Sequence, residues 1–198
     1  MTTFANPASG AHNAAAEYTR RLLDLLGDRD PIEVQSGLVT AVESAVTGLS
    51  DSSLRMPEAP GKWSVMEVVQ HLADTELVYG YRMRMILAHP SPAIEGYDQD
   101  AWASELRYND TPLTEALEQM RVLRRANLRL LQGLGEEQFD RYGIHSERGR
   151  ESIRHIVRLI AAHDLVHRRQ IARIIASRPG PTFPPAPGPF ARRPLPRV

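Results

Sequence analysis

Residues 162–171, AHDLVHRRQI, carry two histidines four positions apart, His163 and His167. At 3.6 residues per helical turn, both imidazole rings project from the same face of an α-helix. That face continues as an apolar stripe, which is the side that a helix buries against its neighbours. The stripe consists of Ile156, Ile160, His163, His167, Ile171 and Ile174. A buried imidazole without a partner costs about 1–3 kcal/mol. The stretch therefore predicts either a metal site or core histidines that are satisfied by hydrogen bonds.

Helical periodicity continues outward from this stretch through most of the chain. Apolar residues recur at helical spacing, and capping patterns such as Ser64 to Glu67 mark where helices begin. No alternating pattern typical of a strand interrupts them. We predict an all-α protein, a four-helix bundle with an extra N-terminal helix over 11–27. The four core helices are expected at about residues 30–49, 64–87, 112–133 and 151–177.

The segments between these helices are expected to be loops over residues 50–62, 89–110 and 136–150. The second of them is long and contains Tyr97 and Trp102, which favour a lid or binding loop over disorder, with a short helix near 98–106.

The chain is expected to form one bundle domain, residues 1–178 with its core at about 28–177. It is followed by a tail over 179–198 with eight prolines in twenty residues. Proline at this density excludes helix and central strand, so the tail is expected to be extended.

Composition excludes several functions. The formal net charge is zero, which gives no electrostatic case for binding nucleic acid or a membrane surface. No apolar run approaches 18 residues, and residues 1–20 lack the pattern of a secretion signal, so we expect a cytoplasmic protein. The chain has no cysteine, so any metal must be held by His, Asp or Glu.

His71 is the third histidine of interest, because it lies in the middle of the predicted helix 64–87. Facing helices of a bundle are a usual place to assemble a metal site in the core. Three histidine ligands leave a fourth position open for water or substrate, as catalytic zinc sites do. The alternative is an ordinary surface or core histidine.

Four motifs resemble the DinB/YfiT-like family, the stress-linked bundle proteins. They are Gly61-Lys62-Trp63-Ser64, His71-Leu72-Ala73-Asp74, His163-x-x-x-His167 and the run Arg168 to Ile171. The resemblance covers about residues 28–177 and implies a divalent metal, zinc or nickel, held by His71, His163 and His167. Relatives include bacillithiol- or mycothiol-dependent S-transferases, a thiol-dependent isomerase and proteins named as metal-dependent hydrolases. Many are dimers, which implies a homodimer here.

A metal at an open three-histidine site lowers the pKa of a bound water or thiol and so supplies a nucleophile near neutral pH. With water the reaction is hydrolysis, and with a low-molecular-weight thiol it is S-transfer to a small molecule. Because the chain has no cysteine, that thiol must come from outside. The alternatives are a non-catalytic metal- or small-molecule-binding stress-response protein on the same bundle, or a structural bundle with vestigial histidines.

Several other polar residues are candidates for the site. Asn127 lies on the core stripe of its helix and is expected to point toward the pocket or a neighbouring helix end. Arg82 is expected to pair with an acid rather than to bind a substrate carboxylate. Asp164 is expected to form a salt bridge or to support a ligand. Asp74 and Glu76 are expected on the helix surface rather than orienting a histidine.

The remaining histidines are expected outside the site. His155 is turned away from the direction of His163, while His12, His89 and His145 fall in loops or at helix ends and are expected to be solvated. Tyr97 and Trp102 are expected either to wall the pocket or to cover the bundle.

Overall fold

The structure, a computed structural model, describes residues 12–178, with side chains described from residue 17. The predicted extended tail over 179–198 and the side chain of His12 therefore lie outside the described residues.

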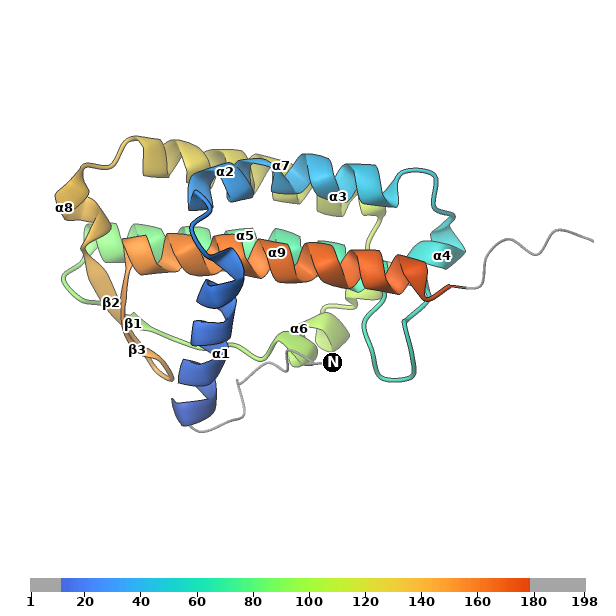
Figure 1. The fold of residues 1–198 in the computed structure, drawn as a ribbon, viewed down its shortest axis with the longest axis horizontal. Coiled ribbons are helices and arrows are strands. Elements are labelled where there is room, and N and C mark those ends of the chain that lie inside the picture. The colour runs from blue at the N-terminus through green and yellow to red at the C-terminus, as the bar shows by residue number, and fades with distance from the viewer. Residues whose placement is uncertain (1–11, 179–198) are drawn as a thin grey trace, which may run out of the picture.

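The fold is the predicted four-helix bundle. Its long helices are α5 (Val65–Ala88), α7 (Leu113–Gln132) and α9 (Ile153–Ala176), and its fourth member is formed by α2 (Pro31–Ser36) and α3 (Leu38–Val46). Figure 1 shows α5 and α9 side by side, with α2, α3 and α7 along one edge and α1 (His12–Leu26) crossing α9. The helix predicted at 30–49 is thus two helices that meet at Gly37.

Local sequence explains where these helices begin. The Asp30 carboxylate accepts hydrogen bonds from the first amides of α2, with Pro31 at the first helical position. Ser64 and Glu67 form the predicted capping box at the start of α5. The Ser152 hydroxyl accepts a hydrogen bond from the His155 amide and caps α9.

Helix α5 is the central helix, because apolar side chains cover more than one of its faces. Val65, Met66, Val68, Val69 and Leu72 are all fully buried. They pack with residues of α3, α7 and α9 in one core cluster. A histidine in the middle of this helix is consequently held in a rigid and dry environment.

A small three-stranded sheet, for which the sequence showed no strand pattern, is added to the predicted helical bundle. β1 (Ala93–Ile94) runs parallel to β2 (Tyr142–His145), which pairs antiparallel with β3 (Gly149–Ser152). These strands have two to four residues, which is too short for an alternating pattern to stand out from a polar loop. Gly149, at φ +73°, is the first residue of β3 and follows the three-residue turn 146–148 of the hairpin.

The segments predicted as loops contain further short elements. They are α4 (Asp51–Arg55), the expected helix α6 (Gln99–Glu105), the 3₁₀ helix η2 (Tyr108–Asp110) and α8 (Glu136–Phe139). None of the helices formed by residues 12–178 is long and apolar enough to cross a membrane.

We expect Gly143→Ala to lower the free energy of unfolding by roughly 1–3 kcal/mol, through overpacking. A Cβ atom at Gly143 would lie 2.5 Å from Ile94 Cδ1 and 2.9 Å from the Pro92 carbonyl oxygen, so β1 and β2 would have to separate. Urea denaturation measures the change. Gly135→Ala is the control, because the nearest atom there is 3.8 Å away. Equal midpoints for the two variants would contradict the prediction.

Candidate metal centre

Three buried histidines converge between α5 and α9. His71 comes from α5, and His163 and His167 come from successive turns of α9. The Nε2 atom of His163 lies 3.1 Å from that of His71 and 3.0 Å from that of His167. The three side chains offer ligand atoms within 4.8 Å of one another, and they form the one such group of three or more His, Cys, Asp or Glu found among residues 12–178.

All three imidazoles are held neutral. Burial lowers the pKa of His71 and of His163 well below its usual value, and neighbouring histidines lower it further. Burial also lowers the pKa of His167 to about 4. Three neutral rings each carry a nitrogen lone pair, which is the form in which histidine binds a metal.

The spacing of these nitrogens fits a metal ion. Ligand nitrogens about 2.0–2.1 Å from a tetrahedral zinc ion lie roughly 3.3 Å apart. The Nε2 separations of 3.0 and 3.1 Å are close to that value. Three ligands also leave a fourth position available, so the residues present fit a divalent metal at an open site.

Neighbouring groups orient the rings. The Nδ1 atom of His167 lies 2.7 Å from Gln170 Oε1, so it carries the hydrogen and leaves the Nε2 lone pair free. Thr75 donates its hydroxyl to the carbonyl oxygen of His71, and its Oγ1 atom lies 3.5 Å from His71 Nε2. His163 Nδ1 is buried without a hydrogen-bond partner. Such an orphaned polar atom is costly and typical of a functional site.

Trp63 forms one wall of the site. The sequence indicated this residue only as part of the motif Gly61-Lys62-Trp63-Ser64. Its ring centroid lies 5.0 Å from that of His71 and 6.5 Å from that of His167, with which it is stacked. The tryptophan is half-buried, so it separates the histidines from solvent. Its position just before the Ser64 cap is the signal that could have placed it here, since the cap fixes how the chain enters α5.

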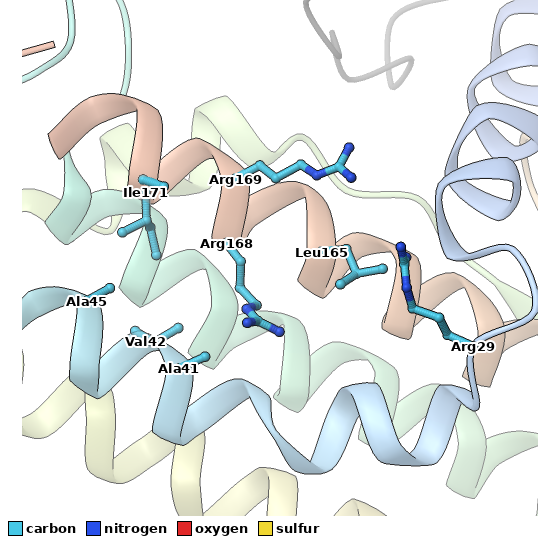
Figure 2. Close-up of a pocket in the computed structure, with 9 residues that line it drawn as sticks. Arg29, Ala41, Val42, Ala45, Leu165, Arg168, Arg169 and Ile171 are labelled. Atoms are coloured by element: carbon cyan, nitrogen blue, oxygen red, sulfur yellow. The ribbon is translucent and has the colours of Figure 1, made fainter. Parts of the chain in front are cut away.

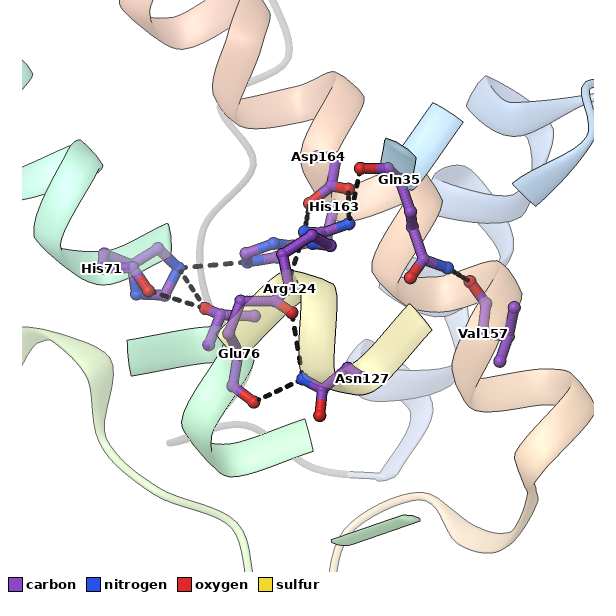
Figure 3. Close-up of polar contacts among 9 residues, drawn as sticks. Gln35, His71, Glu76, Arg124, Asn127, Val157, His163 and Asp164 are labelled. Atoms are coloured by element: carbon purple, nitrogen blue, oxygen red, sulfur yellow. Dashed lines mark hydrogen bonds and ion pairs between the residues drawn. The ribbon is translucent and has the colours of Figure 1, made fainter. Parts of the chain in front are cut away.

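A buried ionic network lies behind the histidines (Figure 3). The Arg124 guanidinium of α7 donates to both carboxylate oxygens of Asp164, at 2.7 and 2.9 Å. It also pairs with Glu76 at 2.7 Å. The predicted salt bridge of Asp164 is therefore present, and the acid supports the helix turn that carries His163.

The placement predicted for Glu76 was wrong. Its side chain is 3% exposed, and its partner Arg124 comes from a helix that the spacing of α5 alone does not reveal. Burial raises the pKa of Glu76, while Arg124 and Asn127 lower it. Burial also raises the pKa of Asp164 to about 6, against the opposing effect of Arg124.

Asn127 is part of this network rather than of a pocket. Its Nδ2 atom donates to the Glu76 backbone carbonyl at 2.9 Å and to Glu76 Oε2 at 3.0 Å, and its Oδ1 atom accepts from Arg84. A Cβ atom at Gly80 would lie 2.5 Å from Asn127 Oδ1. Because glycine has no Cβ atom, the Asn127 side chain of α7 can lie directly against the backbone of α5 at this position. This candidate therefore joins two helices.

Asp74 was also predicted on the surface and is instead buried. Its carboxylate accepts hydrogen bonds from the Tyr108 hydroxyl at 2.6 Å and from Gln119 at 2.7 Å, and a third from Gln70 at 3.2 Å. Burial, together with the bond to Asp74, raises the pKa of Tyr108. All three hydrogen bonds come from residues outside the group of three histidines.

Arg82 does not pair with an acid among residues 12–178, contrary to the prediction. It is buried and donates to the Glu95 carbonyl oxygen at 2.5 Å. Its guanidinium carbon lies 5.4 Å from the Tyr79 ring centroid and 5.9 Å from that of Tyr97. Tyr97 also contacts Trp102, with ring centroids 4.6 Å apart.

The other histidines divide into two groups. His89 is exposed, as expected, and His155 is half-buried and outside the group of three. His145, expected in solvent, is instead 2% exposed, in a strand that is paired on both sides by β1 and β3.

A surface pocket of about 480 Å³ lies between α3 and α9 (Figure 2). It is lined by Arg29, Ala41, Val42, Ala45, Leu165, Arg168, Arg169, Ile171 and Ala172. None of the three histidines borders it, so it is separate from the candidate metal centre.

The bundle and its buried three-histidine group fit a metal-dependent protein of the four-helix-bundle class. The family model of the DinB superfamily matches residues 39–171, and the chain belongs to this superfamily.

Named relatives agree with this assignment. "Putative metal-dependent hydrolase OB0413" of Oceanobacillus iheyensis is 27% identical over 135 residues, covering 68% of this chain and 78% of the relative. "Putative metal-dependent hydrolase YfiT" of Bacillus subtilis is 33% identical over 119 residues, covering 59% of this chain and 65% of the relative, just under two thirds of its length.

A solved structure is similar in fold as well. It is described as "YfiT from Bacillus subtilis is a probable metal-dependent hydrolase with an unusual four-helix bundle topology". It matches with a TM-score of 0.68 at 25% identity, covering 80% of this chain and 86% of that one.

Proposed function

We propose that this protein is a metal-dependent enzyme that activates an external thiol for transfer to a small electrophile. The observation that carries this proposal is the convergence of three neutral imidazoles, in which His163 Nε2 lies 3.1 Å from His71 Nε2 and 3.0 Å from His167 Nε2. These residues would hold a divalent metal, zinc or nickel. When bound at an open site, such an ion lowers the pKa of a thiol or water and supplies a nucleophile near neutral pH.

The surroundings of the histidines favour a thiol over water. Activation of water by metal and protein together commonly uses a nearby carboxylate as general base. Here Glu76 and Asp164 are paired with Arg124, and Asp74 accepts three hydrogen bonds. None of these acids is free to move a proton at the site. A thiol needs less help, because its pKa is already near 8.5. The chain has no cysteine, so the thiol is an external co-substrate.

The chain's own groups position the reaction. Gln170 fixes the tautomer of His167, and the stacked ring of Trp63 limits the access of water. The ion pairs of Arg124 with Asp164 and Glu76 hold α5 and α9 at a fixed separation, and so hold the three nitrogens in place.

Metal-dependent hydrolysis is the second candidate, and the names of the relatives support it. A non-catalytic metal- or small-molecule-binding stress-response protein is the alternative to both. The proposal further includes a homodimer that acts in the cytoplasm on a small molecule. Light scattering coupled to size-exclusion chromatography measures the assembly.

Thiol consumption tests the proposed activity. Zinc- or nickel-loaded protein is mixed with bacillithiol, mycothiol or glutathione and 1-chloro-2,4-dinitrobenzene, and the arylated thiol is measured. We expect one of the thiols to react. His167→Ala is expected to slow the reaction about 100-fold or more, because a bound metal stabilises the transition state by several kcal/mol. His89→Ala, at an exposed position, is the matched control. Turnover that is equal in His167→Ala would contradict the proposal. Metal-dependent ester cleavage with no thiol reaction would favour hydrolysis.

A further inference from the structure

Arg82 carries a buried positive charge on α5, the helix that also supplies His71. The residue is 6% exposed, and its one hydrogen bond to a described residue goes to the Glu95 carbonyl oxygen. No acid pairs with it within residues 12–178, and the segments 1–11 and 179–198 contain neither Asp nor Glu. An unpaired buried charge costs several kcal/mol, which its contacts with two tyrosine rings offset only in part.

His145 supplies a second unsatisfied donor. The residue is 2% exposed, and its Nδ1 atom accepts a hydrogen bond from the Glu147 amide at 3.1 Å. Burial, together with the charges of Arg148 and Arg82 and against the opposing effect of Glu151, lowers the pKa of His145 to about 4, so the ring is neutral. The hydrogen of a neutral ring whose Nδ1 accepts must lie on Nε2. That Nε2 atom is buried and has no partner.

The sheet brings these two donors into one region. Ile94 of β1 is the register partner of His145 in the parallel β1–β2 pair, so both side chains lie on the same face. Ile94 packs in one cluster with Met83 of α5, the residue after Arg82. Arg82 in turn donates a hydrogen bond to the carbonyl oxygen of Glu95, the residue after Ile94. The segment Ile94–Glu95 therefore connects the two donors, since Ile94 pairs with His145 and the Glu95 carbonyl accepts from Arg82, and the charge of Arg82 acts on the imidazole.

One aromatic side chain separates this region from the histidines. The Thr75 side chain lowers the pKa of the Tyr97 phenol against the larger effect of burial, so the two groups are neighbours, and the Thr75 Oγ1 atom lies 3.5 Å from His71 Nε2. The same ring also lies near Arg82, whose guanidinium carbon is 5.9 Å from the ring centroid.

We propose that Arg82 and His145 bind the carboxylate of a small molecule whose reactive end reaches the three histidines. A guanidinium presents parallel N–H donors that match the two oxygens of a carboxylate, and His145 Nε2–H adds a third donor. A single positive charge matches a carboxylate better than a dianionic phosphate, since the imidazole is neutral and Arg148 is already paired with Glu151. That the reactive end lies at the three histidines rests on the proposed function, whereas binding of the carboxylate by Arg82 and His145 does not.

Binding of benzoate, with benzamide as the uncharged analogue, tests the carboxylate site in the full-length, metal-free protein. NMR titration of ¹⁵N-labelled protein is expected to show benzoate binding about 10-fold more tightly or better, with a shift of His145 Nε2. Arg82→Gln is expected to remove the preference. Arg125→Gln, at an exposed position on α7, is expected to keep it. Unchanged benzoate affinity in Arg82→Gln, or no preference in the wild type, would overturn the proposal.

His145→Gln is a second variant, which covers the case in which Arg82→Gln does not fold. It is expected to weaken benzoate binding severalfold without affecting benzamide, and an unchanged benzoate affinity would count against the site. The amide spectrum of each variant reports whether it is folded.

A thiol pair then assigns the carboxylate to its source. In cobalt-loaded protein, the affinities of 3-mercaptopropionate and 3-mercaptopropan-1-ol are compared through the thiolate-to-cobalt absorption. If 3-mercaptopropionate binds more tightly than 3-mercaptopropan-1-ol, and this difference disappears in Arg82→Gln, the result supports the site and places the carboxylate on the thiol. Equal affinities, together with Arg82-dependent benzoate binding, support the site and place the carboxylate on the second substrate. Failure to load cobalt would count against the proposed function alone, because the benzoate result does not involve metal.

Discussion

His163→Ala is expected to weaken zinc binding by at least about 100-fold and to leave the purified protein nearly metal-free. His163 is the central member of the group, because its Nε2 atom lies within 3.1 Å of both other Nε2 atoms. Its removal leaves His71 and His167, which cannot form an open three-ligand site. Metal content by mass spectrometry, on protein purified without a nickel column, and competition with a chelator measure the effect.

His155→Ala is the matched control on the same helix. This histidine is half-buried and outside the group of three, so its variant is expected to bind zinc as the wild type does. Added zinc should raise the melting temperature of the wild type and of His155→Ala, because both bind zinc in the folded state. It should not raise the melting temperature of His163→Ala. A His163→Ala protein that retains one tightly bound zinc ion would refute the assignment of this residue as a ligand.

Arg124→Met is expected to lower the free energy of unfolding by about 3–5 kcal/mol. The change keeps an unbranched apolar stem but removes the guanidinium, and so leaves Glu76 and Asp164 buried without their cation. Arg125→Met is the control, because Arg125 is exposed and its replacement is expected to change stability by about 0.5 kcal/mol or less. Urea denaturation of the two variants measures the difference, and equal midpoints would show that the network does not hold the helices.

The loss in Arg124→Met is expected to depend on pH. Burial raises the pKa of Asp164 to about 6, above its ordinary value of about 3.9 in the unfolded chain. The folded state therefore binds the proton more tightly, so this group lowers stability as the pH rises from the unfolded toward the folded pKa. Without Arg124 the folded pKa rises further. The variant should lose less stability at pH 5 than at pH 8, and the opposite order would contradict this account.

The sequence by itself determined the elements whose signals are local. The four-residue spacing of His163 and His167 places both rings on one helix face, and that face is buried because isoleucines share it. The capping box at Ser64 and Glu67 likewise depends on neighbouring residues, and it begins α5 where predicted. The bundle and its central helix follow from such periodicity, as does the placing of His71 in a buried segment.

Only the tertiary structure decided which polar residues are buried, because their partners are remote in the sequence. Glu76 and Asp164 have the same cation, Arg124, which lies 48 and 40 positions away, and neither pairing leaves a mark on helical spacing. His145 is buried because a strand of two residues, Ala93–Ile94, pairs with its own, and a strand this short has no detectable period. Local spacing fixes the face of a helix on which a side chain lies. The segment packed against that face decides whether a charge on it is paired. Arg124 is paired in this way, whereas Arg82 has no acid among the described residues.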